Sequence, residues 1–90
     1  MELEFIKKGI AALYTNAPNV HVSTKASYQK ELGKETPATL VGVYKNIFQI
    51  EQTVAGRIVR HTYQYGDVLI GHVVIRELDF VPMSSLLNKK

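Results

Sequence analysis

The chain has 90 residues, the length of one domain rather than two, and we expect a single domain over residues 1–90. Hydrophobic residues make up 46% and charged residues 21%, a balance that excludes a wholly disordered chain. There is no cysteine, so disulfide scaffolds, thiolate zinc sites and cysteine nucleophiles are excluded as well.

The sequence also bears on cellular location. No apolar run reaches the roughly 20 residues of a membrane-spanning helix. The chain begins Met1-Glu2-Leu3-Glu4, which places acids where a secretory signal would carry bases. We therefore expect a cytoplasmic protein that does not associate with a membrane.

The net charge of +3 is unevenly distributed. Residues 5–66 contain eight Lys and Arg against three acids, a surplus of five positive charges. A surplus of this kind suits an acidic partner, nucleic acid included. The alternative interpretation is an ordinary soluble surface with a mild basic excess.

The first predicted element is a helix over residues 2–15. Leu3, Ile6, Ile10 and Leu13 recur at spacings of three and four, which places them on one helical face. Pro18 ends the pattern, because proline cannot continue a helix and disfavours helical geometry in the residue before it.

From residue 20 the hydrophobic period changes to two, which predicts strands. Residues 25–37 are polar, lack alternation and predict a loop or a hairpin extension with a loose tip. Strands are expected at 20–24, 40–44, 47–52 and 57–65, with turns at Lys45-Asn46, Ala55-Gly56 and Gly66-Asp67. Residues 68–80 are apolar on both sides and predict a long fifth strand that bends at Gly71.

One helix followed by about five short strands predicts a mainly β fold with an N-terminal α-helix, a small antiparallel barrel of SH3-like or OB-like type. The barrel would cover about residues 19–80 and leave a short tail at 81–90. A sheet with the helix packed on one face is the alternative. At 40–44 either face could be buried, because Val41 and Val43 share one side while Leu40 shares the other with Gly42. The predicted core consists of Leu3, Ile6, Ile10, Leu13, Val20, Val22, Val43, Phe48, Ile50, Val59, Tyr63, Leu69 and Val73.

Two segments resemble the Veg family of small bacterial proteins. Leu40–Ile50 is similar to that family's hairpin, with its glycine, tyrosine and phenylalanine among apolar residues, and Tyr63–Leu69 is similar to its aromatic-x-Tyr-x-Asp-Val-Leu stretch. With Ile6-Lys7 and Val20-His21-Val22 placed before them, the resemblance covers about residues 5–76. It implies an SH3-like barrel and a non-enzymatic cytosolic role in regulation, linked to biofilms and developmental gene control, without catalytic residues.

The sequence contains no recognisable catalytic or metal-binding motif. His21, His61 and His72 show neither His-x-His nor His-x₃-His spacing and fall on different predicted strands. No serine stands in a Gly-x-Ser-x-Gly turn, and no glycine pattern would cradle a phosphate. We therefore expect no enzymatic activity, no metal and no cofactor. Asp67 is expected to accept main-chain N–H groups and fix its turn.

Two functions fit these features. The first is an interaction or regulatory module that binds a protein partner through a barrel edge or an apolar groove. The alternative is a nucleic-acid-binding small barrel, since aromatic rings can stack on bases while cations neutralise phosphates. The candidate residues for nucleic acid are Lys25, Tyr28, Lys30, Lys34, Lys45, Arg57 and Arg60.

The predicted fifth strand also suggests self-association. Its apolar residues outnumber those that one small core and one helix could cover, and exposed apolar patches usually mark interfaces. We therefore predict a symmetric homodimer in which the contact comes from this strand or from the tail residues Leu78, Phe80, Leu86 and Leu87.

Overall fold

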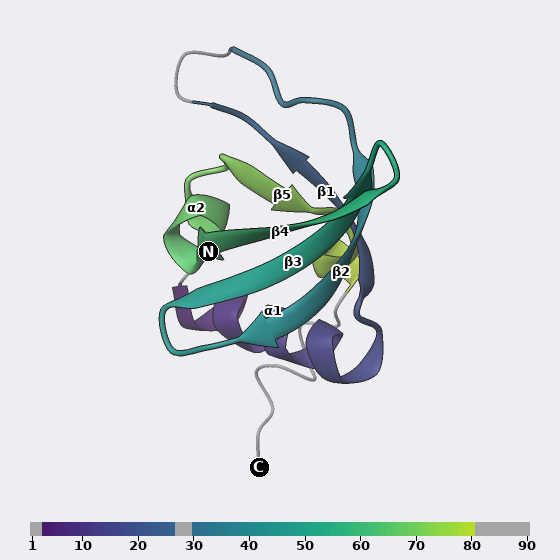
Figure 1. The fold of residues 1–90 in the computed structure, drawn as a ribbon. Coiled ribbons are helices and arrows are strands. Elements are labelled where there is room, and N and C mark those ends of the chain that lie inside the picture. Colours follow the sequence, from purple (N-terminus) through teal and green to yellow (C-terminus); the bar gives the residue numbers. More distant parts are fainter. Residues whose placement is uncertain (1–2, 27–29, 81–90) are drawn as a thin grey trace.

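The computed structural model describes residues 3–26 and 30–80, and for residues 79 and 80 only the backbone. The predicted class, mainly β with an N-terminal helix, is confirmed (Figure 1). In chain order the elements are α1 (Leu3–Asn16), β1 (Asn19–Thr24), β2 (Thr36–Val43), β3 (Ile47–Val54), β4 (Arg57–Gln64), α2 (Tyr65–Leu69), β5 (Val73–Ile75) and a 3₁₀ helix, η1 (Arg76–Phe80).

The five strands form one antiparallel sheet in the order β4-β3-β2-β1-β5. Every pair of neighbours is antiparallel, so the two edge strands, β4 and β5, run in the same direction. They cannot close the sheet by antiparallel pairing, and within the described residues they do not pair. The sheet therefore curves over α1 as a barrel that stays open between β4 and β5 (Figure 1).

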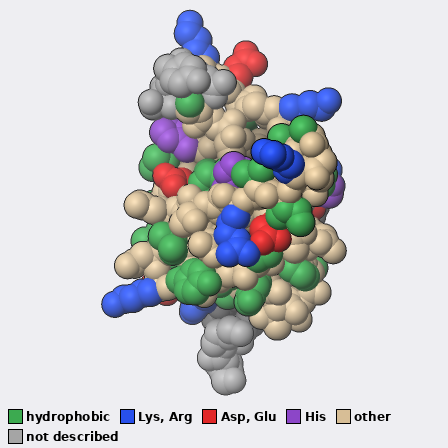
Figure 2. Space-filling model, in the orientation of Figure 1, with side chains coloured by type: hydrophobic (Ala, Val, Ile, Leu, Met, Phe, Trp, Pro, Cys, Tyr) green, Lys and Arg blue, Asp and Glu red, His purple; other side chains and the backbone are tan. Residues whose placement is uncertain are grey.

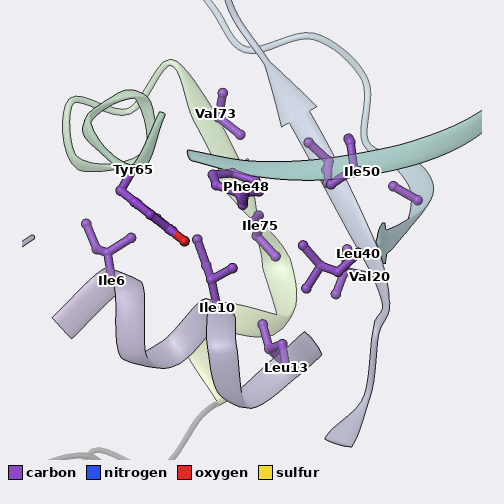
Figure 3. Close-up of a cluster of buried hydrophobic side chains, with 12 residues drawn as sticks. Ile6, Ile10, Leu13, Val20, Leu40, Phe48, Ile50, Tyr65, Val73 and Ile75 are labelled. Atoms are coloured by element: carbon purple, nitrogen blue, oxygen red, sulfur yellow. The ribbon is translucent and has the colours of Figure 1, made fainter. Parts of the chain in front are cut away.

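The core lies between α1 and the concave face of the sheet (Figure 3). Ile6, Ile10 and Leu13 point from the helix toward Phe48, whose side chain is fully buried. Most of the predicted core is confirmed, and Val43 and Tyr63 pack partly buried against it. Leu3, which was expected in the core, is 43% exposed because it lies one turn before the part of α1 that packs on the sheet.

A β-bulge in β2 settles which side of residues 40–44 is buried. Leu40 pairs with Ile50 and Val43 pairs with Phe48, so β2 holds one residue more than β3 between the two pairs. In a regular strand Leu40 and Val43 would face opposite sides. The extra residue brings both to the core side.

The long strand predicted for residues 68–80 is wrong. The predicted turn at Gly66-Asp67 instead lies in the short helix α2, and only Val73–Ile75 are extended. Gly71 has φ +85° and ends the helical segment, after which η1 follows β5 directly. Leu69, predicted in the core, is 44% exposed because it lies on the outer side of α2. The predicted loop is shorter too, since β2 already begins at Thr36.

Candidate interaction site at the open edge of the sheet

Half of the main-chain hydrogen-bonding groups of edge strand β4 point away from β3. Ala55 and Gly56 both have positive φ, 53° and 78°, as a two-residue hairpin turn requires. In such a hairpin the pair that flanks the turn is hydrogen-bonded, and bonded pairs alternate from there. The groups that face outward are therefore those of Ile58, Arg60 and Thr62.

The free edge ends where α2 begins. The next outward N–H, that of Gln64, donates to Oδ2 of Asp67 at 2.9 Å. The expectation that Asp67 accepts a main-chain N–H is confirmed, although it does so at the start of a helix rather than in a simple turn. The edge that remains without a strand partner among the described residues runs from Ile58 to Thr62.

The inner side of β4 carries side chains that are only partly covered. Val59, His61 and Tyr63 are each half-buried and alternate along the concave face. The rings of His61 and Tyr63 stack at 6.0 Å, and Tyr63 lies 5.9 Å from the buried ring of Phe48. Val59 was predicted in the core. It is only half-buried because it lies on the edge strand of a barrel that is open beside β4.

We call this combination the β4 seam: the outward main chain of Ile58, Arg60 and Thr62 together with the side chains of Val59, His61 and Tyr63. Ile58 adds an apolar group on the outer side, where its side chain is 74% exposed. A strand added at this edge could form hydrogen bonds with the outward main-chain groups. Its own side chains could cover the half-buried row.

At its α2 end the β4 seam opens into a cleft of about 460 Å³, lined by Thr24, Lys25, Ala26, Tyr63, Asp67, His72 and Val73. Burial raises the pKa of the Tyr63 hydroxyl, and the nearby Asp67 carboxylate raises it further. The hydroxyl therefore stays neutral at physiological pH and can donate a hydrogen bond. At the α2 end of β4, where the main-chain pairing of an added strand would end, the cleft therefore offers polar groups for hydrogen bonds to that strand.

Positive charge lies at both ends of the β4 seam. Arg57 is exposed beside the β3–β4 turn, and Lys25 lines the cleft at the other end. Neither forms an ion pair with a described side chain. Arg60 differs, because its Nη2 lies 2.6 Å from Oε2 of Glu51 across the outer face. Arg57 and Lys25 are therefore the cations available to a partner.

The candidate residues for nucleic acid do not form one surface. Lys30 and Lys34 are exposed in the segment before β2, whereas Lys45 lies in the turn before β3 and Arg57 lies just after the turn at its other end. An eight-residue strand separates those turns by about 25 Å. Figure 2 shows basic side chains scattered over this face among hydrophobic ones. Tyr28 lies outside the described residues, and binding of nucleic acid stays a prediction.

The residues predicted for self-association lie elsewhere. Leu78 is half-buried and packs against the core, with its side chain close to Gly9 of α1. It therefore already has a contact within the chain, because η1 folds back beside α1. The side chain of Phe80 and residues Leu86 and Leu87 lie outside the described residues, so the homodimer stays a prediction.

A polar network between β1 and η1 has a structural role. Nδ1 of His21 lies 2.6 Å from Oε2 of Glu77, whose Oε1 accepts the main-chain N–H of His21 at 2.7 Å. Arg76 extends the network to Glu35 with an Nη1–Oε1 distance of 3.0 Å. Burial alone would raise the pKa of Glu77, but the hydrogen bonds from His21 outweigh burial and lower it. These contacts fasten η1 to β1.

The described residues contain no group of three side chains that could hold a metal ion. His21 lies on β1, His61 on β4 and His72 just before β5. Within the same residues, no helix combines the length and apolar character that a membrane crossing requires.

Comparison with known proteins gives no match: neither a protein-family model nor a curated protein sequence corresponds to this chain.

The β4 seam could not be identified from the sequence. The sequence pattern of this segment was visible, but Val59 and Tyr63 were assigned to the core. Arg57 and Lys25 were singled out as phosphate contacts rather than as the two ends of one site. The missing information was the position of β4 at the sheet edge, which depends on the pairing of all five strands.

Proposed function

We propose that this protein is a non-enzymatic interaction module that acts in regulation by binding an extended segment of a protein partner along the β4 seam. The observation that carries the proposal is the edge from Ile58 to Thr62, which has no strand partner among residues 3–26 and 30–80, beside the half-buried side chains of β4. Main-chain bonds would supply affinity, and the side chains on the inner face would select the sequence. The resemblance to the Veg family supports the regulatory role.

The experiment uses a substitution that changes only the outward edge. Thr62→Pro removes an N–H that points away from β3, and proline is tolerated at such positions of edge strands. Thr62→Ala is the matched control, because it keeps the N–H and loses the same hydroxyl, which accepts a bond from Gln49. Both variants should retain the circular dichroism spectrum of the parent.

Tagged parent and variant chains are used to capture partners from the native lysate, with and without nuclease. We expect a protein that is captured by the parent and by Thr62→Ala, is lost with Thr62→Pro, and is insensitive to nuclease. Equal capture by Thr62→Pro would contradict binding at the edge. Loss of all capture on nuclease treatment would favour the nucleic-acid alternative.

A further inference from the structure

We infer that the β4 seam selects a seven-residue extended segment. Its first, third and fifth residues are apolar, and its seventh residue is acidic. This inference rests on the proposed function and names the class of partner, an acidic extended peptide. Its pattern follows from three features of the described residues: strand direction, the side chains along β4, and the position of Arg57.

Strand direction sets the orientation of the ligand. β4 and β5 run in the same direction, so one strand inserted between them would be antiparallel to both. Antiparallel pairs are also the commoner kind. The N-terminal end of the ligand would then lie at the cleft beside Tyr63, and its C-terminal end beside Arg57.

The inner face of β4 sets the apolar positions. In an antiparallel pair, residues directly opposite each other project to the same face of the sheet. Ligand residues opposite Tyr63, His61 and Val59 would therefore cover the half-buried row, and apolar side chains would gain most from that contact. The residues between them would lie on the outer side, next to Thr62, Arg60 and Ile58, where polar side chains are accommodated.

The acidic position follows from Arg57. Arg57 lies on the same face as Val59, two residues nearer the turn, and forms no ion pair with a described side chain. Counted from the ligand residue opposite Tyr63, the residue opposite Arg57 is the seventh and last. A glutamate there would pair with Arg57, so the pattern reads apolar-x-apolar-x-apolar-x-acidic from the N-terminus.

Charge also argues against a second copy of this chain in the β4 seam. In a two-fold antiparallel pairing centred on the outward main chain of Arg60, this arginine would lie opposite its own copy, and like charges opposite each other destabilise a sheet. β4 carries two arginines and no acid, and the whole chain has a net charge of +3. An acidic partner is complementary where a second copy is not.

The test measures binding of a labelled peptide, Ile-Thr-Val-Ser-Val-Thr-Glu, by fluorescence anisotropy. Three control peptides accompany it: one with the terminal residue changed to Gln, one with it changed to Lys, and one of the same composition with the alternation shuffled. We expect the shuffled peptide to bind at least tenfold more weakly. The Gln peptide should bind about two- to fivefold more weakly, the size of an exposed ion pair.

Two protein variants make the assignment to Arg57 specific. Arg57→Glu should weaken binding of the Glu peptide and strengthen binding of the Lys peptide, which reverses the preference. Lys45→Glu is the matched control, because it makes the same charge change at the turn on the opposite end of β3 and should leave the preference intact.

The outcomes separate this inference from the proposed function. If the Glu, Gln and Lys peptides bind equally while Thr62→Pro abolishes binding of all three, the acidic position is wrong and the strand-addition site stands. If partner capture from the lysate is unaffected by Thr62→Pro, the proposed function itself fails. A parent chain that sediments as a dimer, and that Thr62→Pro converts to monomer, would place a second copy in the β4 seam and overturn the inference. Failure of the Glu peptide to bind would overturn it as well.

Discussion

Replacing Phe48 with alanine is the most direct test of how this domain is held together. Phe48 is 0% exposed at the centre of the concave face, and its ring centroid lies 5.9 Å from that of Tyr63 and 5.6 Å from that of Tyr65. The substitution removes a buried ring and leaves a cavity between α1 and the sheet. We expect a loss of about 3–5 kcal/mol in the free energy of unfolding.

That loss is large for a domain of this size, because small domains are stable by about 5–15 kcal/mol in total. Each kcal/mol should lower the melting temperature by about 4–8 °C. The measurement is urea unfolding followed by circular dichroism, in which a changed midpoint at an unchanged slope reports stability alone.

Ile58→Ala serves as the control, since it also shortens an apolar side chain in the same sheet but at a position that is 74% exposed. It should change stability by less than about 0.5 kcal/mol. A loss below about 1 kcal/mol for Phe48→Ala would refute the reasoning, because it would mean that the β2–β3 hairpin does not carry the core.

Three further predictions concern single contacts. Tyr65→Phe removes the hydroxyl that donates to the carbonyl oxygen of Tyr44 at 2.7 Å. It should lower the free energy of unfolding, measured in urea, by about 1 kcal/mol. An unchanged midpoint would show that this hydrogen bond does not stabilise the fold. The pKa of Glu77 is lowered in the folded state, so its contribution to stability is present above a pH of about 4.5 and is lost as the pH falls through the folded pKa. Unfolding followed between pH 3 and 7 should therefore show a shallower loss on acidification for Glu77→Gln than for the parent; identical pH profiles would contradict the role of His21 as its partner. Ala55→Gly relieves a positive φ of 53° at a non-glycine residue and should stabilise the chain by about 0.5–1 kcal/mol in thermal unfolding, and a lowered melting temperature would argue against that turn geometry.

Much of the fold could be predicted from local patterns. The spacing of Ile6, Ile10 and Leu13 predicted α1, and the alternation of apolar and polar residues predicted β1, β3 and β4. The turns at Lys45-Asn46 and Ala55-Gly56 were visible because asparagine and glycine are common in tight turns, and Gly56 does adopt a positive φ. These features depend on side chains within a few residues of each other, so the sequence contains them directly.

The segment after β4 could not be predicted in this way. Its apolar residues lie on both sides of any strand drawn through them, and the helix α2 is only five residues long. A helix of that length depends on tertiary packing rather than on its own propensity. Here the buried side chain of Tyr65 and the contact from Asp67 to Gln64 hold it in place. Neither contact appears as a period in the sequence.

The bulge in β2 and the β4 seam were decided by tertiary structure alone. The bulge exists only relative to β3, because it is the mismatch between two paired strands that brings both Leu40 and Val43 to the core. The seam exists because five antiparallel strands leave the first and last of the sheet running in the same direction, with β4 as one edge. The alternation of β4 is that of any half-buried strand. Whether a neighbouring strand covers it depends on the number, direction and pairing of segments far apart in the chain, and a local pattern carries no information about these.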